Sequence, residues 1–244
     1  MKESTTAKKP DVRKYRGVFF DLDGTLIDSA GIWHESERAL IRKYGGFVPE
    51  DMHNAKEVLF AANKSPNIYI EWAQYLIDRF QLKNISAKAA DTYMLKYSTK
   101  LFKKLTYKKD ADKLLLTLKK HGFITALVTL SSDTVINILK NENINIKTRA
   151  DFDSVFNTIV TAGKVKKNKP NPDCYLHAMD ILGLKPNECL AFEDSLTGAL
   201  ASTQAGIDTC IVYDKHSDTN REKLLELTPY HINSFDEVLI RLSV

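Results

Sequence analysis

Short apolar runs, each closed by polar or turn-forming residues, recur along most of this chain. Residues 18–20, 123–128, 155–160, 188–192 and 208–212 form such runs. Their length is typical of strands that are buried on both faces of a parallel sheet. The pattern therefore predicts a sheet of buried strands in which residues 18–20 form the first strand.

Between these runs, apolar residues recur at helical spacing. The expected helices cover residues 111–120, 133–140, 171–182 and 196–205, and short helices surround Arg221 and Asp236. Strands that alternate with helices imply right-handed crossovers and helices on both faces of the sheet. We therefore predict an α/β fold with a doubly wound parallel sheet.

The stretch after the first strand has a different pattern, with helical spacing and no strand. Its apolar stripes comprise Trp33, Leu40 and Tyr44, then Ile68, Trp72, Tyr75, Leu76 and Phe80, then Ala90, Met94, Tyr97, Leu101 and Leu105. We expect these side chains to form the core of a small helical domain rather than ligand contacts. The predicted organisation is a flexible tail at residues 1–14, an α/β core at 15–31 and 106–244, and a helical cap domain at 32–105.

Composition narrows the classes of partner. The chain has 244 residues and a net charge of +4, with lysines scattered along it rather than gathered in a basic stripe, so we expect no nucleic-acid partner. No apolar run reaches the roughly 18 residues of a membrane span, and we expect no membrane partner. Cys174, Cys189 and Cys210 lack metal-ligand spacing, which favours buried thiols in a reducing compartment. We expect a cytoplasmic monomer.

The first predicted strand ends on two acids, Asp21 and Asp23, followed by Gly24. In an extended chain, alternate side chains point the same way, so both carboxylates can converge beyond the strand, where open α/β sheets bind ligands. Two anions there need a cation between them, most simply a divalent metal. The alternatives are a plain Asp-Gly turn and a calcium loop, although Gly24 and Ile32 occupy the wrong positions for the latter.

Other predicted strand ends add polar groups to the same edge of the sheet. Thr129 follows the second strand, and the N–H groups of Leu130 and Ser131 would open a helix and bind an anion. Lys169 follows the third strand and precedes a proline, and the fourth strand ends on Glu193 and Asp194. Each group has a structural alternative, such as a helix cap or a solvated loop. Together they predict a site for Mg²⁺ and a phosphoryl group.

This ordered set resembles the haloacid dehalogenase-like (HAD) superfamily over about residues 16–236. The resemblance lies in Asp21-Leu-Asp-Gly-Thr25, in Thr129 at the end of an apolar strand, in Lys169-Pro170, and in Glu193-Asp194-Ser195 before a helix of small residues. The helical segment between the first motif and the second strand is similar to the cap of the β-phosphoglucomutase-like phosphatase branch.

The resemblance implies a phosphoric monoester hydrolase that uses Mg²⁺ and a phosphoaspartate intermediate. Asp21 would be the nucleophile and Asp23 the general acid and base. The metal ligands would be Asp21, the backbone carbonyl of Asp23, and Asp194, with Glu193 assisting. The expected phosphate site consists of Gly24, Thr129, Leu130, Ser131 and Lys169. The substrate would be a small phosphate ester, of sugar or polyol type.

A hexose-phosphate mutase is the alternative function, because it would use the same two aspartates. Relatives of that kind typically carry an arginine in a cap loop, whereas residues 61–67 offer Asn63 and Lys64, which we take as candidate substrate contacts. A dehalogenase would not need Asp23. A binding module without activity would be expected to lack a catalytic group, and none is missing. The chain departs from many relatives at Ala30-Gly31 and at Leu130, which affects substrate contacts rather than the reaction.

Overall fold

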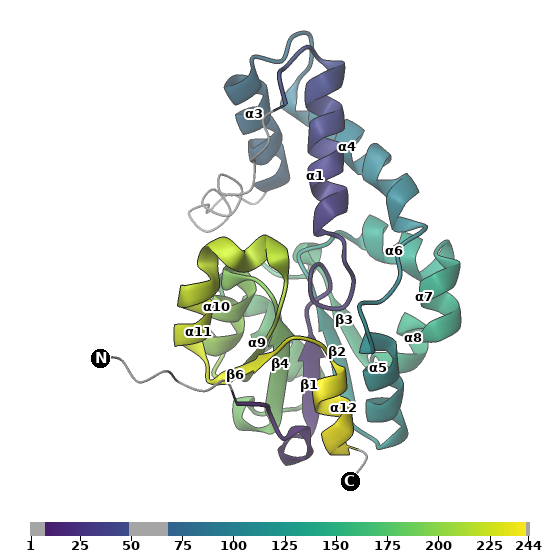
Figure 1. Ribbon diagram of the computed structural model, residues 1–244, viewed down its shortest axis with the longest axis vertical. Helices are drawn as coiled ribbons and strands as arrows, with labels where there is room; N and C mark the ends of the chain where they lie inside the picture. The colour runs from purple at the N-terminus through teal and green to yellow at the C-terminus, as the bar shows by residue number, and fades with distance from the viewer. Residues whose placement is uncertain (1–7, 49–67, 243–244) are drawn as a thin grey trace.

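A parallel sheet with helices on both faces forms the larger part of the molecule (Figure 1). This computed structural model describes residues 8–48 and 68–242. The strands are β1 (Gly17–Phe20), β2 (Ile124–Val128), β3 (Thr158–Val160), β4 (Cys189–Glu193), β5 (Asp208–Val212) and β6 (Tyr230–Ile232). They lie in the order β3-β2-β1-β4-β5-β6, and every neighbouring pair is parallel. The predicted α/β fold with a doubly wound parallel sheet is confirmed.

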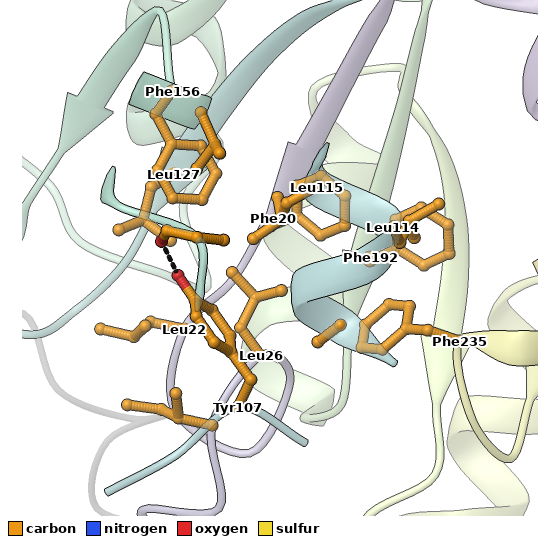
Figure 2. Close-up of a cluster of buried hydrophobic side chains, with 14 of the residues drawn as sticks. Phe20, Leu22, Leu26, Tyr107, Leu114, Leu115, Leu127, Phe156, Phe192 and Phe235 are labelled. Atoms are coloured by element: carbon orange, nitrogen blue, oxygen red, sulfur yellow. Dashed lines mark hydrogen bonds between the residues drawn. The ribbon is translucent and has the colours of Figure 1, made fainter. Parts of the chain in front are cut away.

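The two faces of the sheet are covered by separate hydrophobic clusters. Val18 and Phe20 of β1 belong to the larger cluster, while Phe19 between them belongs to the other, as the alternation of side chains along a strand requires. Figure 2 shows the larger cluster, in which the rings of Phe20 and Phe192 stack with their centroids 5.2 Å apart. The helices that contribute buried side chains to this cluster include α5 (Ala111–Lys120), α6 (Asp133–Asn141), α7 (Ile144–Arg149), α8 (Phe152–Val155) and α12 (Asp236–Leu242).

On the opposite face, α9 (Asp173–Leu182) and α10 (Leu196–Gln204) cover the sheet, and α11 (Arg221–Leu227) packs against α10. The small residues of α10 let it approach the sheet closely, since a Cβ atom on Gly198 would come within 1.9 Å of Glu193 Oε2. A helix of small residues can therefore lie directly over a polar side chain of β4.

Helices α1 (Ala30–Lys43), α3 (Ile68–Phe80) and α4 (Ala87–Phe102) stand beyond the upper end of the sheet in Figure 1. They share a hydrophobic cluster whose buried members include Leu40, Trp72, Leu76 and Met94. These side chains belong to the predicted apolar stripes. Trp33 differs from the expectation, because it packs edge-on against Phe102 beside the sheet cluster.

Several boundaries differ from the sequence-based expectation. The predicted strand 155–160 begins only at Thr158, because the Asp151 side chain caps α8, which extends to Val155. Helix α7 was not predicted, and Asn143 caps it by accepting a hydrogen bond from the N–H of Ile146. The edge strand β6 was not predicted either, since three residues are too few to show a pattern.

The N-terminal residues that are described lie against the sheet instead of forming a tail. Lys8 forms a parallel bridge with Tyr230, and its carbonyl accepts a hydrogen bond from the N–H of His231 at 3.0 Å. Val12 is 2% exposed within the larger cluster. The structure therefore departs from the predicted tail at residues 8–14, while residues 1–7 lie outside the described part.

Two further expectations concern the chain as a whole. Cys174, Cys189 and Cys210 are buried free thiols, as predicted. Within residues 8–48 and 68–242, no helix combines the length and the apolar character needed to cross a membrane.

Candidate active site

Three neighbouring strands in the middle of the sheet end beside one another with polar residues. Asp21 follows β1, Thr129 follows β2, and β4 ends on Glu193, which precedes Asp194. Because β1 pairs in parallel with both β2 and β4, these residues reach the same edge of the sheet. Lys169 joins them from the loop between β3 and α9. The structure thus brings together the acids and the lysine that the sequence predicted to meet.

Lys169 lies at the centre of a buried cluster of charges. Its Nζ is 2.7 Å from Asp21 Oδ1 and 2.7 Å from Glu193 Oε1, and it donates to the carbonyl of Val128 at 2.8 Å. Lys169 is 4% exposed, Asp21 is 7% exposed and Glu193 is fully buried. An ammonium group has three N–H donors, so these contacts use all of them and fix the lysine beside the Asp21 carboxylate.

Burial and mutual repulsion both act on the carboxyl groups of this cluster. Burial raises the pKa of Asp21 well above its usual value, against the lowering effect of Lys169. Burial, followed by Glu193 and Asp214, raises the pKa of Asp194 to about 8. Burial alone would lower the pKa of Lys169, but the adjacent Asp21 and Glu193 raise it overall. One ammonium cannot balance three buried carboxylates, so the cluster requires protons or a further cation.

The carboxylates of Asp21, Glu193 and Asp194 can hold a metal ion. One oxygen from each lies within 4.8 Å of the other two. Within the described part of the chain, Glu193 Oε2 is buried and has no hydrogen-bond partner. Three carboxylates supply the oxygen ligands that hard cations such as Mg²⁺ prefer. The residues therefore fit the predicted Mg²⁺.

Gly24 allows the loop after β1 to lie against this acidic group. Its φ is +87°, and a Cβ atom at this position would come within 2.3 Å of Asp194 Oδ2. The next residue, Thr25, donates its hydroxyl hydrogen to Asp194 Oδ1 at 2.8 Å. The glycine thus positions the backbone around Asp194, while its predicted contact with phosphate stays a prediction.

Asp23 has a separate set of partners. Its Oδ1 accepts hydrogen bonds from the Ser29 hydroxyl at 2.5 Å and from Trp33 Nε1 at 3.3 Å, and its Oδ2 accepts from the Ser131 hydroxyl at 2.6 Å. Its carboxylate is not one of the three that could hold a metal. The acids that could share a cation with Asp21 are thus Glu193 and Asp194, and not Asp23 as the spacing of the first motif suggested. A metal contact through the backbone carbonyl of Asp23 stays a prediction.

The loop after β2 differs in part from the predicted anion site. The Thr129 hydroxyl accepts the N–H of Ser131 at 2.9 Å, so this N–H is already engaged. Helix α6 begins at Asp133, where the sequence predicted it, with Ser132 as its cap, so Leu130 and Ser131 precede the helix and do not open it. Leu130 uses its carbonyl to accept a hydrogen bond from the Tyr69 hydroxyl at 2.7 Å. Ser131 thus reaches the site through its hydroxyl group, which contacts Asp23.

Sequence reasoning missed several residues that support the site. Tyr175 of α9 donates its hydroxyl hydrogen to Glu193 Oε1 at 2.5 Å, and its ring lies 5.3 Å from Lys169 Nζ. Lys108 donates to the carbonyl of Gly24 at 2.5 Å and to Asp214 Oδ2 at 2.8 Å. Nothing in the spacing of these residues signals such contacts, because they join segments that are distant along the chain. Asn63 and Lys64, the candidate substrate contacts, lie outside the described residues.

The fold and the site define a class of protein, namely α/β enzymes with an acid–lysine site at the carboxyl edge of a parallel sheet and helices inserted after the first strand. A profile of the haloacid dehalogenase-like hydrolases matches residues 15–206. The chain belongs to this family, as its motifs predicted. The predicted enzyme class, a phosphoric monoester hydrolase, is confirmed by the family and by relatives named as phosphatases.

Individual relatives share part or nearly all of the chain. The chain is 30% identical over 190 residues to a bifunctional riboflavin kinase/FMN phosphatase from Arabidopsis thaliana. The match covers 78% of this chain and 46% of that protein, so the chain spans about half the length of that relative. It is 28% identical over 233 residues to hexitol phosphatase A from Escherichia coli K12, covering 92% of this chain and 94% of the relative.

Solved structures show the same fold. The crystal structure of a β-phosphoglucomutase from Clostridium difficile matches with a TM-score of 0.66 and 21% identity, covering 94% of this chain and 97% of that chain. At this identity the likeness concerns the fold alone. It agrees with the predicted α/β fold with helices inserted after the first strand.

Proposed function

We propose that this chain is a Mg²⁺-dependent phosphatase that hydrolyses a small sugar- or polyol-type phosphate monoester through a phosphoaspartate at Asp21. The observation that carries the proposal is the division of the two aspartates between different surroundings. Asp21 lies against Lys169 and two further acids, whereas Asp23 lies against two hydroxyl groups and an indole N–H. These surroundings support a nucleophilic role for Asp21 and a proton-transfer role for Asp23.

Asp21, Glu193 and Asp194 would hold Mg²⁺, together with the backbone carbonyl of Asp23. The bound cation would offset the negative charge of the carboxylates and of the phosphoryl oxygens. Lys169 contributes a fixed positive charge next to Asp21. This charge reduces the repulsion between the nucleophile and the phosphate dianion.

In the first step, a carboxylate oxygen of Asp21 attacks phosphorus and the bond between phosphorus and the ester oxygen breaks. Asp23 gives its proton to that oxygen, and the alcohol leaves. In the second step, Asp23 takes a proton from water as the water oxygen attacks phosphorus, which releases phosphate and regenerates Asp21. Serine hydroxyls both donate and accept hydrogen bonds, so Ser29 and Ser131 can hold Asp23 in either protonation state.

We also propose that residues 32–105 act as a cap domain over this site. Helices α1, α3 and α4 stand beyond the end of the sheet (Figure 1), and Trp33 of α1 contacts Asp23 directly. A cap in this position would exclude bulk water and enclose the leaving group. The similarity to a hexitol phosphatase supports a polyol-type substrate.

The proposal is tested by measuring phosphate release from p-nitrophenyl phosphate and from sugar and polyol phosphates, with Mg²⁺ and with a chelator. We expect release only with Mg²⁺. Incubation with β-glucose 1-phosphate and a trace of glucose 1,6-bisphosphate separates the alternative function. If glucose 6-phosphate formed faster than free phosphate, the protein would be a mutase and the proposed phosphatase function would be wrong.

A further inference from the structure

A cavity of about 120 Å³ lies between α1, α3, α4 and the cap of α6. Trp33 and Glu37 line it from α1, Tyr69 and Trp72 from α3, and Asp91 from α4. The volume of this cavity is of the same order as that of an engineered protein cavity of about 150 Å³ that binds benzene. It can therefore take a compact organic group.

The cavity adjoins the active site. Trp33, which lines it, donates its indole N–H to Asp23 Oδ1 at 3.3 Å. Tyr69, which also lines it, donates its hydroxyl hydrogen to the carbonyl of Leu130, next to Ser131. A leaving group that receives its proton from Asp23 would consequently extend toward this cavity.

Among the described residues that line the cavity, the charged side chains are Glu37 and Asp91. Glu37 is 2% exposed, and its Oε1 accepts the indole N–H of Trp72 at 2.9 Å, while Oε2 lies 3.3 Å from Nδ1 of His34. Asp91 is half-buried. Among the lining residues that the structure describes there is no lysine, arginine or histidine. Carboxylate oxygens accept more than one hydrogen bond each, so both acids can receive substrate hydroxyl groups, whereas an anion placed there would be repelled.

The aromatic lining is held in place by other rings. Trp33 packs edge-on against Phe102 with the ring centroids 5.2 Å apart, and Trp72 stacks on Tyr75 with the centroids 5.1 Å apart. Such fixed rings offer apolar surfaces to the carbon skeleton of a ligand, while the carboxylates accept from its hydroxyl groups. The cavity thus combines the two kinds of contact that a polyol needs.

We propose that Glu37 and Asp91 make this cavity a specificity pocket for uncharged, hydroxyl-rich leaving groups, and that they reject leaving groups carrying a second anion. The inference rests on the proposed function, because it names the substrate class of that same site. It also gives a reason, independent of residues 61–67, for a phosphatase rather than a mutase, since a mutase must accommodate a second phosphate.

The test uses two matched pairs of substrates, glycerol 3-phosphate with 3-phosphoglycerate and sorbitol 6-phosphate with 6-phosphogluconate. The members of each pair differ by a terminal hydroxymethyl or carboxylate group. We expect kcat/KM for the neutral member of the preferred pair to exceed that of the acid by about tenfold or more. Asp91→Asn and Glu37→Gln should each narrow this ratio several-fold, because they keep the shape of the side chain and remove its charge.

Asp78→Asn is the matched control, because Asp78 is an exposed acid of α3 that contacts only Gln74 among the described residues. It should leave the ratio unchanged, and circular dichroism should show that all three variants are folded.

Equal kcat/KM for the members of both pairs, or a ratio that neither Asp91→Asn nor Glu37→Gln alters, would overturn the inference. Hydrolysis of p-nitrophenyl phosphate without hydrolysis of any of the four substrates would also overturn it. No Mg²⁺-dependent release from p-nitrophenyl phosphate would instead refute the proposed function, and the pocket with it.

Discussion

Asp21 and Asp23 are separated by one residue, yet their side chains meet different groups. Asp21 is paired with an ammonium and lies with two other carboxylates, while Asp23 receives three neutral hydrogen bonds. Substituting each aspartate should therefore damage a different part of the reaction.

Asp23→Asn should reduce turnover by roughly 10²–10⁴-fold, the usual contribution of a general acid–base group. Mg²⁺ affinity should be retained, because the Asp23 carboxylate lies outside the acidic group that fits a metal. Calorimetric titration with Mg²⁺ measures the second quantity. A loss of affinity as large as that caused by Asp194→Asn would contradict this division of roles.

Tyr175→Phe should weaken Mg²⁺ binding by about tenfold, within the range expected for partners of a metal ligand. The substitution removes the hydroxyl group that donates to Glu193 but keeps the ring that packs against Phe19. Tyr213→Phe is a suitable control, because its hydroxyl contacts only Asp218 among the described residues. Equal Mg²⁺ affinity in wild type and Tyr175→Phe would show that the Tyr175 hydroxyl does not position Glu193.

The sequence predicted the acids and the lysine of the site because each directly follows a strand or lies in a motif. It could not predict Tyr175, Ser29 or Lys108 as supporting residues. Their roles depend on how distant segments pack, and neither hydrophobic periodicity nor local spacing carries that information. Trp33 was expected in the helical core for the same reason, since its helical spacing does not reveal that it faces Asp23.

At the scale of elements, Lys108 connects the loop after β1 to the loop after β5. Its ammonium contacts the carbonyl of Gly24 and the carboxylate of Asp214, which is almost fully buried. Lys108→Met should lower the free energy of unfolding by about 2–4 kcal/mol, because it leaves this acid without its cation.

The adjacent Lys109 provides the comparison for urea denaturation. The Lys109 side chain is 71% exposed, and its Nζ lies 3.6 Å from Asp236 Oδ2. Lys109→Met should therefore lower the free energy of unfolding by no more than about 0.5 kcal/mol. Equal losses in the two variants would show that the contacts of Lys108 do not stabilise the fold.

The principal strands and helices were predictable because their apolar patterns are long enough to reveal a period. The short elements β6, α7 and α8 were not, since they contain three, six and four residues. Helix α8 is an example: Asp151 caps a single helical turn that ends at Val155, the first residue of the predicted strand.

At the scale of the whole molecule, the buried acidic group links metal binding to stability. Bound Mg²⁺ would offset the repulsion among Asp21, Glu193 and Asp194, and a ligand at 100 times its Kd stabilises a folded protein by about 2.7 kcal/mol. We expect the thermal midpoint to rise with Mg²⁺ in wild type and to rise much less in Asp194→Asn. Calorimetry that finds the same midpoint with Mg²⁺ and with a chelator would argue against a metal site here.

The central claim is that Asp21 is the nucleophile of a phosphatase, and phosphate release by Asp21→Asn tests it most directly. The substitution leaves Lys169 paired with Glu193 and removes one charge from a crowded acidic group, so the fold should remain intact by circular dichroism. With p-nitrophenyl phosphate and Mg²⁺, wild type should release phosphate, and folded Asp21→Asn should be at least about 10⁴-fold slower. Substantial phosphate release by folded Asp21→Asn would contradict the account.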